Sequence, residues 1–453
     1  MGNAEKTVLL INPLWLGLDE PFEHLGLGYL AACLRHSGIG TEICNLPLTG
    51  DPVAAVLEMT ADKKVGLIGV SITFQESAAE ILSFTARLKG RTEVPLVLGG
   101  IYPTFAAEEI MSLFPAVDYI VKGEGEETLP ELAEVLFTGG NAREVAGIFG
   151  RTGEVIWETA DRPSVGDLDS LPFPARDLLP GVLEQTGYAS LLSSRGCYGR
   201  CTFCSVNAFF ARFGAKYRMR SVENVLAEME ELQRNYGVRN FAFNDANFIC
   251  GRKGRERAFE FAESLLKRGI KARFSIQCRV NDVEKELFAL LKKAGLCKVF
   301  LGVESGSQTV LDRFQKDATV VQNLEALKVL SDLDIFVAMG FIMFDYWTTF
   351  AELAENMAFL RVVRQVTGKP YLAEVDPVSK VLPFAGTKVE AELKKLGRYR
   401  GNTLSFSYSM ADPLVEAAYK GLKAAASVSR KIKTLRGRSV YHEFDWETGK
   451  IKD

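Results

Sequence analysis

Three cysteines fall within eight residues of this chain, at Cys197, Cys201 and Cys204, with gaps of three and then two residues. Three thiolates on one short loop can each hold one iron of a 4Fe–4S cube and leave the fourth iron open to another ligand. A structural zinc site would need a fourth cysteine or a histidine at suitable spacing. The nearest later cysteine, Cys250, is remote in the sequence and no histidine lies close by, so the spacing favours an iron–sulfur cluster.

The Cys-x3-Cys-x2-Cys spacing, with Phe203 directly before the last cysteine, resembles the signature of radical S-adenosylmethionine (SAM) enzymes. The resemblance implies that SAM chelates the open iron through its amino and carboxylate groups. It further implies that one electron cleaves SAM to methionine and a 5′-deoxyadenosyl radical, which removes hydrogen from a small-molecule substrate. An external one-electron donor such as flavodoxin or ferredoxin is then expected.

The second half of the chain alternates strands and helices. Strands are expected at Ala189–Ser194, Asn240–Asn244, Ala272–Cys278, Lys298–Val303, Ile335–Ile342 and Tyr371–Val375. Six strands, each but the last followed by a helix, fit the partial (β/α)6 barrel of radical SAM enzymes. Catalytic groups of parallel barrels lie at the carboxyl ends of the strands, and the cysteine loop follows the first of these ends.

Polar residues stand at the other strand ends, where the resemblance implies contacts to SAM. Asn244 suits its ammonium group, Arg279 can pair bidentately with its carboxylate, and Glu304 resembles the acid that holds ribose hydroxyls. Each residue alone could equally be a turn or cap residue, but their order on successive strands favours cofactor binding. The expected cofactor-binding residues are Phe203, Asn244, Asp245, Gln277, Arg279, Glu304, Ser305, Gly340 and Ile342.

Three acids, Asp345, Glu374 and Asp376, follow the fifth strand or lie near the sixth, beside aromatic residues. As catalytic groups they would surround a cationic, hydroxylated substrate and transfer protons. The alternative is that they are solvated loop acids. The sequence alone leaves both interpretations open.

The first part of the chain also alternates short strands and helices, which predicts an open parallel sheet covered on both faces. Its strand ends, where ligands of such sheets bind, are rich in glycine and proline, as at Gly99-Gly100 and Gly123–Glu126. This layout, with Leu25-Gly26-Leu27-Gly28 opening the first helix, resembles the cobalamin-binding domain of one radical SAM subclass. The fold class expected is therefore α/β, with this sheet followed by the barrel and a small helical C-terminal region.

The expected lower ligand of cobalamin is absent from the sequence. Where many cobalamin proteins have Asp-x-His-x-x-Gly, this chain has Pro13-Leu14-Trp15-Leu16-Gly17, and His24 and His36 are expected to be cap or surface residues. Some members of the subclass bind cobalamin without that histidine. The sequence therefore leaves cobalamin binding open.

The expected domain organisation has four parts. Residues 1–160 form the cobalamin-binding-like domain, 161–187 a proline-rich linker, 188–389 the barrel and 390–453 a C-terminal extension with a helix at Pro413–Arg430. The basic run Arg430–Arg438 is expected to be a solvated face, with a lid or a docking surface for the electron donor as alternatives.

Composition excludes other classes of protein. The 54 basic and 57 acidic residues are nearly balanced, so no nucleic-acid or membrane-surface partner is expected. No apolar run reaches the roughly 18 residues of a membrane span, and the first residues lack the pattern of a signal peptide. The scattered cysteines outside the loop do not resemble a disulfide framework, which favours a reducing cytoplasm.

Two reactions compete as the outcome of hydrogen abstraction. The subclass majority are cobalamin-dependent methyltransferases, whereas the absent histidine and the acid-rich strand ends resemble radical SAM diol dehydratases of apramycin-type aminoglycoside biosynthesis. We favour dehydration of a vicinal diol on a paromamine-type amino sugar, completed by a separate nicotinamide-dependent reductase. C-methylation is the first alternative, and a non-catalytic iron–sulfur sensor is the second.

Overall fold

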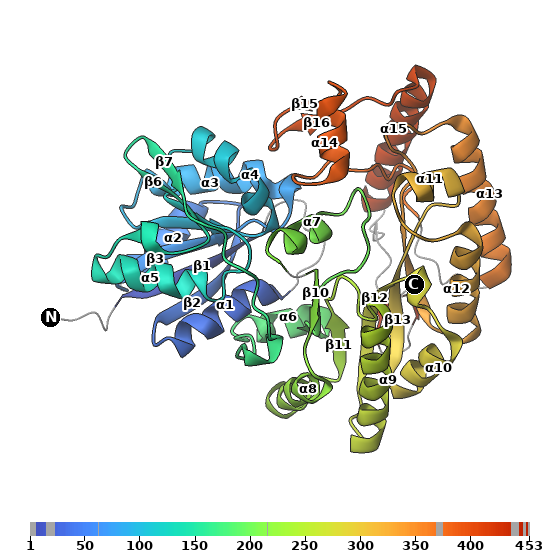
Figure 1. Ribbon diagram of the computed structural model, residues 1–453, viewed down its shortest axis with the longest axis horizontal. Coiled ribbons are helices and arrows are strands. Elements are labelled where there is room, and N and C mark those ends of the chain that lie inside the picture. Colours follow the sequence, from blue (N-terminus) through green and yellow to red (C-terminus); the bar gives the residue numbers. More distant parts are fainter. Residues whose placement is uncertain are drawn as a thin grey trace.

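The computed structural model describes residues 6–14, 23–61, 63–214, 216–367, 375–435, 444–446 and 450–451. Figure 1 shows two α/β units side by side, the first in blue and cyan and the second from green to orange, with the C-terminal helices in red above them. This arrangement confirms the predicted fold class.

The first unit is a seven-stranded sheet in the order β2-β1-β3-β4-β5-β6-β7, in which the first five strands are parallel. Its strands are β1 (Thr7–Leu14), β2 (Gly40–Pro47), β3 (Val65–Ser71), β4 (Leu96–Gly99), β5 (Tyr119–Val121), β6 (Ile148–Thr152) and β7 (Val155–Glu158). The antiparallel β6 and β7 form a hairpin at the edge.

Helices cover both faces of this sheet because an interior strand such as β1 is apolar on both sides. Along β1, Val8 and Leu10 pack on one cluster of buried side chains, while Leu9 and Ile11 pack on another. Such continuous burial is typical of parallel strands. The helices of this unit are α1 (Leu25–His36), α2 (Pro52–Ala61), α3 (Ala78–Lys89), α4 (Ile101–Leu113) and α5 (Thr128–Thr138), with single turns η1 (Gln75–Ser77) and η2 (Ala142–Glu144).

The second unit is a five-stranded parallel sheet in the order β14-β13-β12-β11-β8. Its strands are β8 (Ala189–Leu191), β11 (Asn240–Phe243), β12 (Arg273–Arg279), β13 (Leu296–Glu304) and β14 (Phe336–Phe341). Of the predicted sixth strand, Tyr371–Val375, only Val375 lies within the described residues. A single parallel bridge between Phe344 and Lys380 lies just beyond β14.

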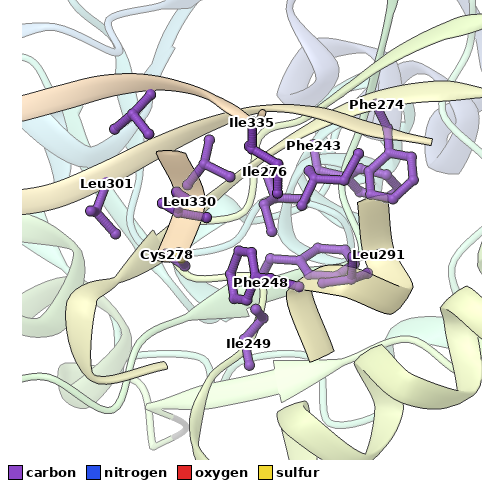
Figure 2. Close-up of a cluster of buried hydrophobic side chains, with 14 of the residues drawn as sticks. Phe243, Phe248, Ile249, Phe274, Ile276, Cys278, Leu291, Leu301, Leu330 and Ile335 are labelled. Atoms are coloured by element: carbon purple, nitrogen blue, oxygen red, sulfur yellow. The ribbon is translucent and has the colours of Figure 1, made fainter. Parts of the chain in front are cut away.

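Phenylalanines and aliphatic side chains fill the space between this sheet and its helices. Figure 2 shows Phe243, Phe248 and Phe274 beside Ile276 and Leu291, and the Phe243 ring meets those of Phe248 and Phe274 edge to face at 5.0 and 6.0 Å. The helices of this unit are α8 (Val222–Tyr236), α9 (Gly251–Arg268), α10 (Lys285–Ala294), α11 (Gln308–Arg313), α12 (Val320–Asp332) and α13 (Phe350–Thr367), with the turn η4 (Val280–Asp282).

The predicted strand Ala189–Ser194 is in fact two strands. β8 ends at Leu191, and β9 (Ser194–Gly196) leaves the sheet to pair antiparallel with β10 (Tyr217–Met219). Gly196 has φ 90°, and a β-carbon there would overlap the Lys216 carbonyl, so this turn away from the sheet requires glycine. The two-stranded ribbon β9–β10 therefore leads the chain away from the sheet, and Cys197 directly follows β9.

The linker and the C-terminal region connect the two units. The linker contains η3 (Leu168–Ser170) and α6 (Leu179–Thr186), and the C-terminal region contains α14 (Lys388–Lys395), β15 (Arg400–Gly401), β16 (Phe406–Ser407), α15 (Pro413–Leu435), β17 (Phe444–Asp445) and β18 (Lys450–Ile451). The Gln75 side chain of the first unit donates to the Thr403 carbonyl at 2.7 Å and accepts from the Ala385 amide at 2.8 Å. No helix in the described ranges has the length and apolar character needed to cross a membrane.

Candidate active site between the two units

A cavity of about 410 Å³ lies between the carboxyl edge of the first sheet and the segments of the second unit that flank the cysteine loop. The first unit contributes the ends of β3, β4 and β5, including Gly69, Gly99 and Gly123. The second unit contributes the ribbon β9–β10 at Arg195 and the aromatic side chains of α7 (Ser205–Arg212), including Phe209. The lining is largely apolar, which suits a large ring ligand placed between the units.

Glycines keep the floor of this cavity open. A β-carbon at Gly99 would have no atom within 4 Å, so any side chain there would project into empty space. Gly100 follows with φ 119°, a conformation that other residues avoid. These positions fit the predicted ligand site at the strand ends, and they would let the edge of a corrinoid ring approach the backbone.

His24 lies at the wall of the cavity and caps α1, as predicted. Its Nδ1 accepts from the Leu27 amide at 3.1 Å, and its Nε2 lies 2.8 Å from Ser71 Oγ and 3.1 Å from Thr73 Oγ1. Burial lowers the pKa of His24 to about 4, so the ring is neutral at physiological pH. With both ring nitrogens engaged, His24 could bind cobalt only by giving up one of these contacts.

The three clustered cysteines lie together on the loop after β9. Cys197 and Cys201 are buried, and Gly199 donates its amide to Cys197 Sγ at 3.4 Å. A hydrogen bond from the Cys250 thiol lowers the pKa of Cys197 to about 6, whereas burial raises that of Cys204 to about 11. Within the described residues, no three cysteine, histidine or acidic side chains converge on a position where they could hold one metal ion. A cube, in which each sulfur binds its own iron, needs no such convergence.

Cys250 is nearer to this loop than the sequence suggested. It is buried at the start of α9, and its Sγ accepts from the Tyr198 amide at 3.1 Å. The sequence separation concealed this contact, because the loop before α9 folds back over the cysteine loop. Cys250 is therefore a neighbour of the cysteine loop at Cys197 and Tyr198.

Arg279 and Glu304 also lie at this site. Arg279 Nη1 donates to Cys201 Sγ at 3.2 Å, and its other terminal nitrogen donates to the Lys316 carbonyl. Glu304 has φ 67°, which is uncommon for a residue other than glycine, and its carboxylate accepts from Lys316 Nζ at 2.8 Å. Lys316 was not predicted, because its neighbours Gln315 and Asp317 make the segment look like a solvated loop.

The other predicted cofactor residues fall into two groups. Asn244 is exposed and lines the cavity, Phe203 packs edge-on to Phe314 at 5.2 Å, and Gln277 is half-buried on β12. Gly340 and Ile342 adjoin Glu304: a β-carbon at Gly340 would lie 3.6 Å from its carboxylate, and the Ile342 amide donates to its carbonyl at 2.8 Å.

Asp245 and Ser305 instead point into the protein. Asp245 is fully buried and accepts from the Ser193 amide at 3.1 Å and from the hydroxyls of Ser193 and Ser194. Ser305 Oγ donates to Asn356 at 2.8 Å. These contacts fix the loops around the site and leave little capacity for SAM.

The described residues do not assemble the predicted acidic pocket. Asp345 is buried and ion-paired with Arg313 at 2.7 Å, and it also accepts from Thr348 Oγ1 at 3.0 Å. Asp376 is exposed and accepts from the Val378 amide at 3.1 Å within a turn. Glu374 lies outside the described residues. The sequence predicts Asp345 as a catalytic acid because its ion-pair partner Arg313, on α11, is too distant along the chain to be recognised there.

Comparison with known proteins supports both halves of this arrangement. Residues 191–360 match the Radical SAM superfamily, and residues 18–133 match the B12 binding domain. The hopanoid C-3 methylase of Methylococcus capsulatus is 30% identical over 380 residues, which cover 81% of this chain and 68% of the relative. The anaerobic magnesium-protoporphyrin IX monomethyl ester cyclase of Cereibacter sphaeroides is 35% identical over 263 residues. That match covers 54% of this chain but only 41% of the relative's length.

Solved structures share the whole arrangement. The cobalamin-dependent radical enzyme OxsB, with aqua-cobalamin and SAM bound, superposes with a TM-score of 0.79 at 23% identity, covering 96% of this chain and 69% of that one. The methyltransferase TsrM from Kitasatospora setae gives 0.70 at 19% identity, covering 87% and 77%. Its B12-binding domain, which precedes the radical SAM domain in the sequence, indicates cobalamin as a further cofactor beside the 4Fe–4S cluster and SAM. The chain therefore belongs to the radical SAM superfamily.

Proposed function

We propose that this protein is a cobalamin-dependent radical SAM methyltransferase that acts on a carbon atom of a small molecule. The observation that carries the proposal is the shared cavity: the carboxyl edge of the first sheet lines one space together with the two segments that flank the cysteine loop, Ser194–Gly196 and α7. A methyl donor and a radical generator placed there would reach the same substrate. The hopanoid C-3 methylase among the relatives also favours methyl transfer.

The residues divide into those that hold cofactors and those that exclude water. We assign Cys197, Cys201 and Cys204 to the cluster, Arg279 to the SAM carboxylate, and Glu304, which Lys316 holds in place, to the ribose hydroxyls. When bound, the cluster and SAM supply the 5′-deoxyadenosyl radical and the corrinoid supplies the methyl group. Phe209 and Phe210 lie over the cavity and would keep water from the radical.

The dehydration hypothesis has less support. It requires an acid that protonates the leaving hydroxyl, yet Asp345 is committed to Arg313 and Asp376 caps an exposed turn. None of the relatives named above is a diol dehydratase. We also propose that the chain is organised as residues 1–160, 161–187, 188–389 and 390–453, with the third part carrying the radical chemistry.

Anaerobic purification with hydroxocobalamin tests the proposal. We expect about one cobalt per chain, and reduction in the presence of SAM should yield both 5′-deoxyadenosine and S-adenosylhomocysteine. A methylated product formed only with cobalamin would complete the assignment. Cobalt-free protein that converts paromamine to a product lighter by one water would overturn methyl transfer and restore dehydration.

A further inference from the structure

The ribbon that carries the first cluster cysteine has two arginines directly opposite each other. Arg195 on β9 pairs in register with Arg218 on β10, and both side chains are at least nine-tenths buried. Like charges facing each other across two strands are destabilising, and a buried unpaired charge is costly. The ribbon β9–β10 cannot be stable in this form without neighbouring carboxylates.

Those carboxylates come from the other unit. Glu124, in the loop between β5 and α5, accepts from Arg195 Nη1 at 2.7 Å and from both terminal nitrogens of Arg218 at 2.8 Å. Glu126 accepts from Arg195 Nη2 at 2.6 Å. Two buried carboxylates thus neutralise two buried guanidinium groups, and only Glu124 contacts both arginines.

This group of four side chains connects the cavity to the cysteine loop. Glu124, Glu126 and Arg195 line the cavity, and Arg195 precedes Cys197 by two residues. The Glu124 carboxylate also accepts from the Val165 amide of the linker at 2.9 Å. A change in the loop that holds Glu124 is therefore transmitted directly to the strand that positions Cys197.

We propose that Glu124 of the B12-binding unit is a positioning residue for the iron–sulfur site of the other unit. By holding Arg195 and Arg218 together, its carboxylate keeps the ribbon β9–β10, and with it Cys197, in the geometry that the cluster needs. The inference rests on the proposed assignment of the three cysteines to the cluster, but it does not depend on methyl transfer. It also implies that filling the cavity and assembling the cluster affect each other's equilibrium to the same extent.

The test is iron content and the electron paramagnetic resonance (EPR) signal of the reduced cluster in full-length variants reconstituted anaerobically without substrate or cobalamin. Glu124→Gln should lose most of its iron, because the arginines then oppose each other across the ribbon. Adding Arg218→Met should recover most of that iron by removing the opposing charge. Glu126→Gln should lose less iron than Glu124→Gln, since Arg218 keeps its partner.

Glu131→Gln is the matched control, because Glu131 belongs to the same unit and pairs with an arginine, Arg162, but its side chain is 44% exposed. It should retain the iron and the signal of the unchanged protein. Full iron in Glu124→Gln would overturn the proposal, as would a loss that Arg218→Met does not reverse. If Glu124→Gln fails to fold, the proposal is tested with Glu126→Gln and with the double variant Glu124→Gln, Arg218→Met. A folded double variant without iron would overturn the proposal. Failure of methyl transfer would leave every one of these measurements unchanged.

Discussion

Replacing Glu304 by glutamine should affect SAM binding and stability separately. The Glu304 carboxylate lies 2.8 Å from Lys316 Nζ, and both side chains are buried. At an effective dielectric constant of about 20, a charge pair at this distance has a gross attraction of about 6 kcal/mol, most of which is offset by desolvation. Removing one partner leaves the Lys316 ammonium buried and unpaired, which costs about 3–5 kcal/mol of the free energy of unfolding.

The same substitution should weaken SAM binding. Loss of a charge-assisted hydrogen bond to the ribose costs about 1.5–3 kcal/mol, or roughly ten- to a hundredfold in Kd. A second substitution, Lys316→Met, removes the unpaired ammonium, so Glu304→Gln with Lys316→Met should regain stability while SAM affinity remains low. Denaturant unfolding measures the first quantity and calorimetric titration of the reconstituted protein with SAM measures the second. Unchanged SAM affinity in Glu304→Gln would refute the ribose assignment, and unchanged stability would refute the importance of the buried pair.

Three further outcomes are expected. Alanine at any of the three clustered cysteines should abolish the cluster and SAM cleavage. Cys250→Ala should instead retain iron but lower the midpoint potential of the cluster, because Cys197 loses a hydrogen bond. An unshifted potential in an EPR-monitored redox titration would contradict this. Gly99→Leu should fill the cavity and prevent cobalt retention without changing iron content, and normal cobalt uptake would place the corrinoid elsewhere. The pKa of His24 is lowered to about 4 in the folded protein from a usual value of about 6.5, so acidification protonates this side chain in the unfolded chain first. The free energy of unfolding is therefore unaffected by His24 above pH 6.5 and falls by up to about 3 kcal/mol as the pH drops toward 4. His24→Gln should lack this part of the pH dependence of unfolding, and identical profiles would contradict the assignment.

The α/β architecture was predictable because its signals are local. Buried parallel strands such as β1 are short apolar runs, and helices such as α8 present one apolar stripe. The ribbon β9–β10 was missed because it depends on Glu124, about seventy residues earlier in the chain, which neutralises its opposed arginines. No local pattern in the segment Ser194–Gly196 indicates that partner.

The same distinction applies to the site. The cysteine spacing is a local pattern, and it predicts an iron–sulfur loop without any information about the tertiary fold. Lys316 is recognisable as a site residue only in the folded structure, where it contacts Glu304. Cys250 is likewise recognisable only there, where its sulfur contacts the Tyr198 amide. Asp345 looked like a free acid in the sequence, since Arg313 reaches it across a distance of 32 positions.

The bridge made by Gln75 sets an order of events during synthesis. Residues that line the cavity, up to Ala246, leave the ribosome long before Ala385 and Thr403, the two backbone partners of the Gln75 side chain. Domains generally fold as units while they emerge, so the first unit, whose last strand ends at Glu158, can fold before either partner of Gln75 has been made. In the nascent chain the first unit therefore folds while the Gln75 side chain still lacks both of its backbone partners, and completion of the C-terminal region then fixes this unit to the rest of the protein.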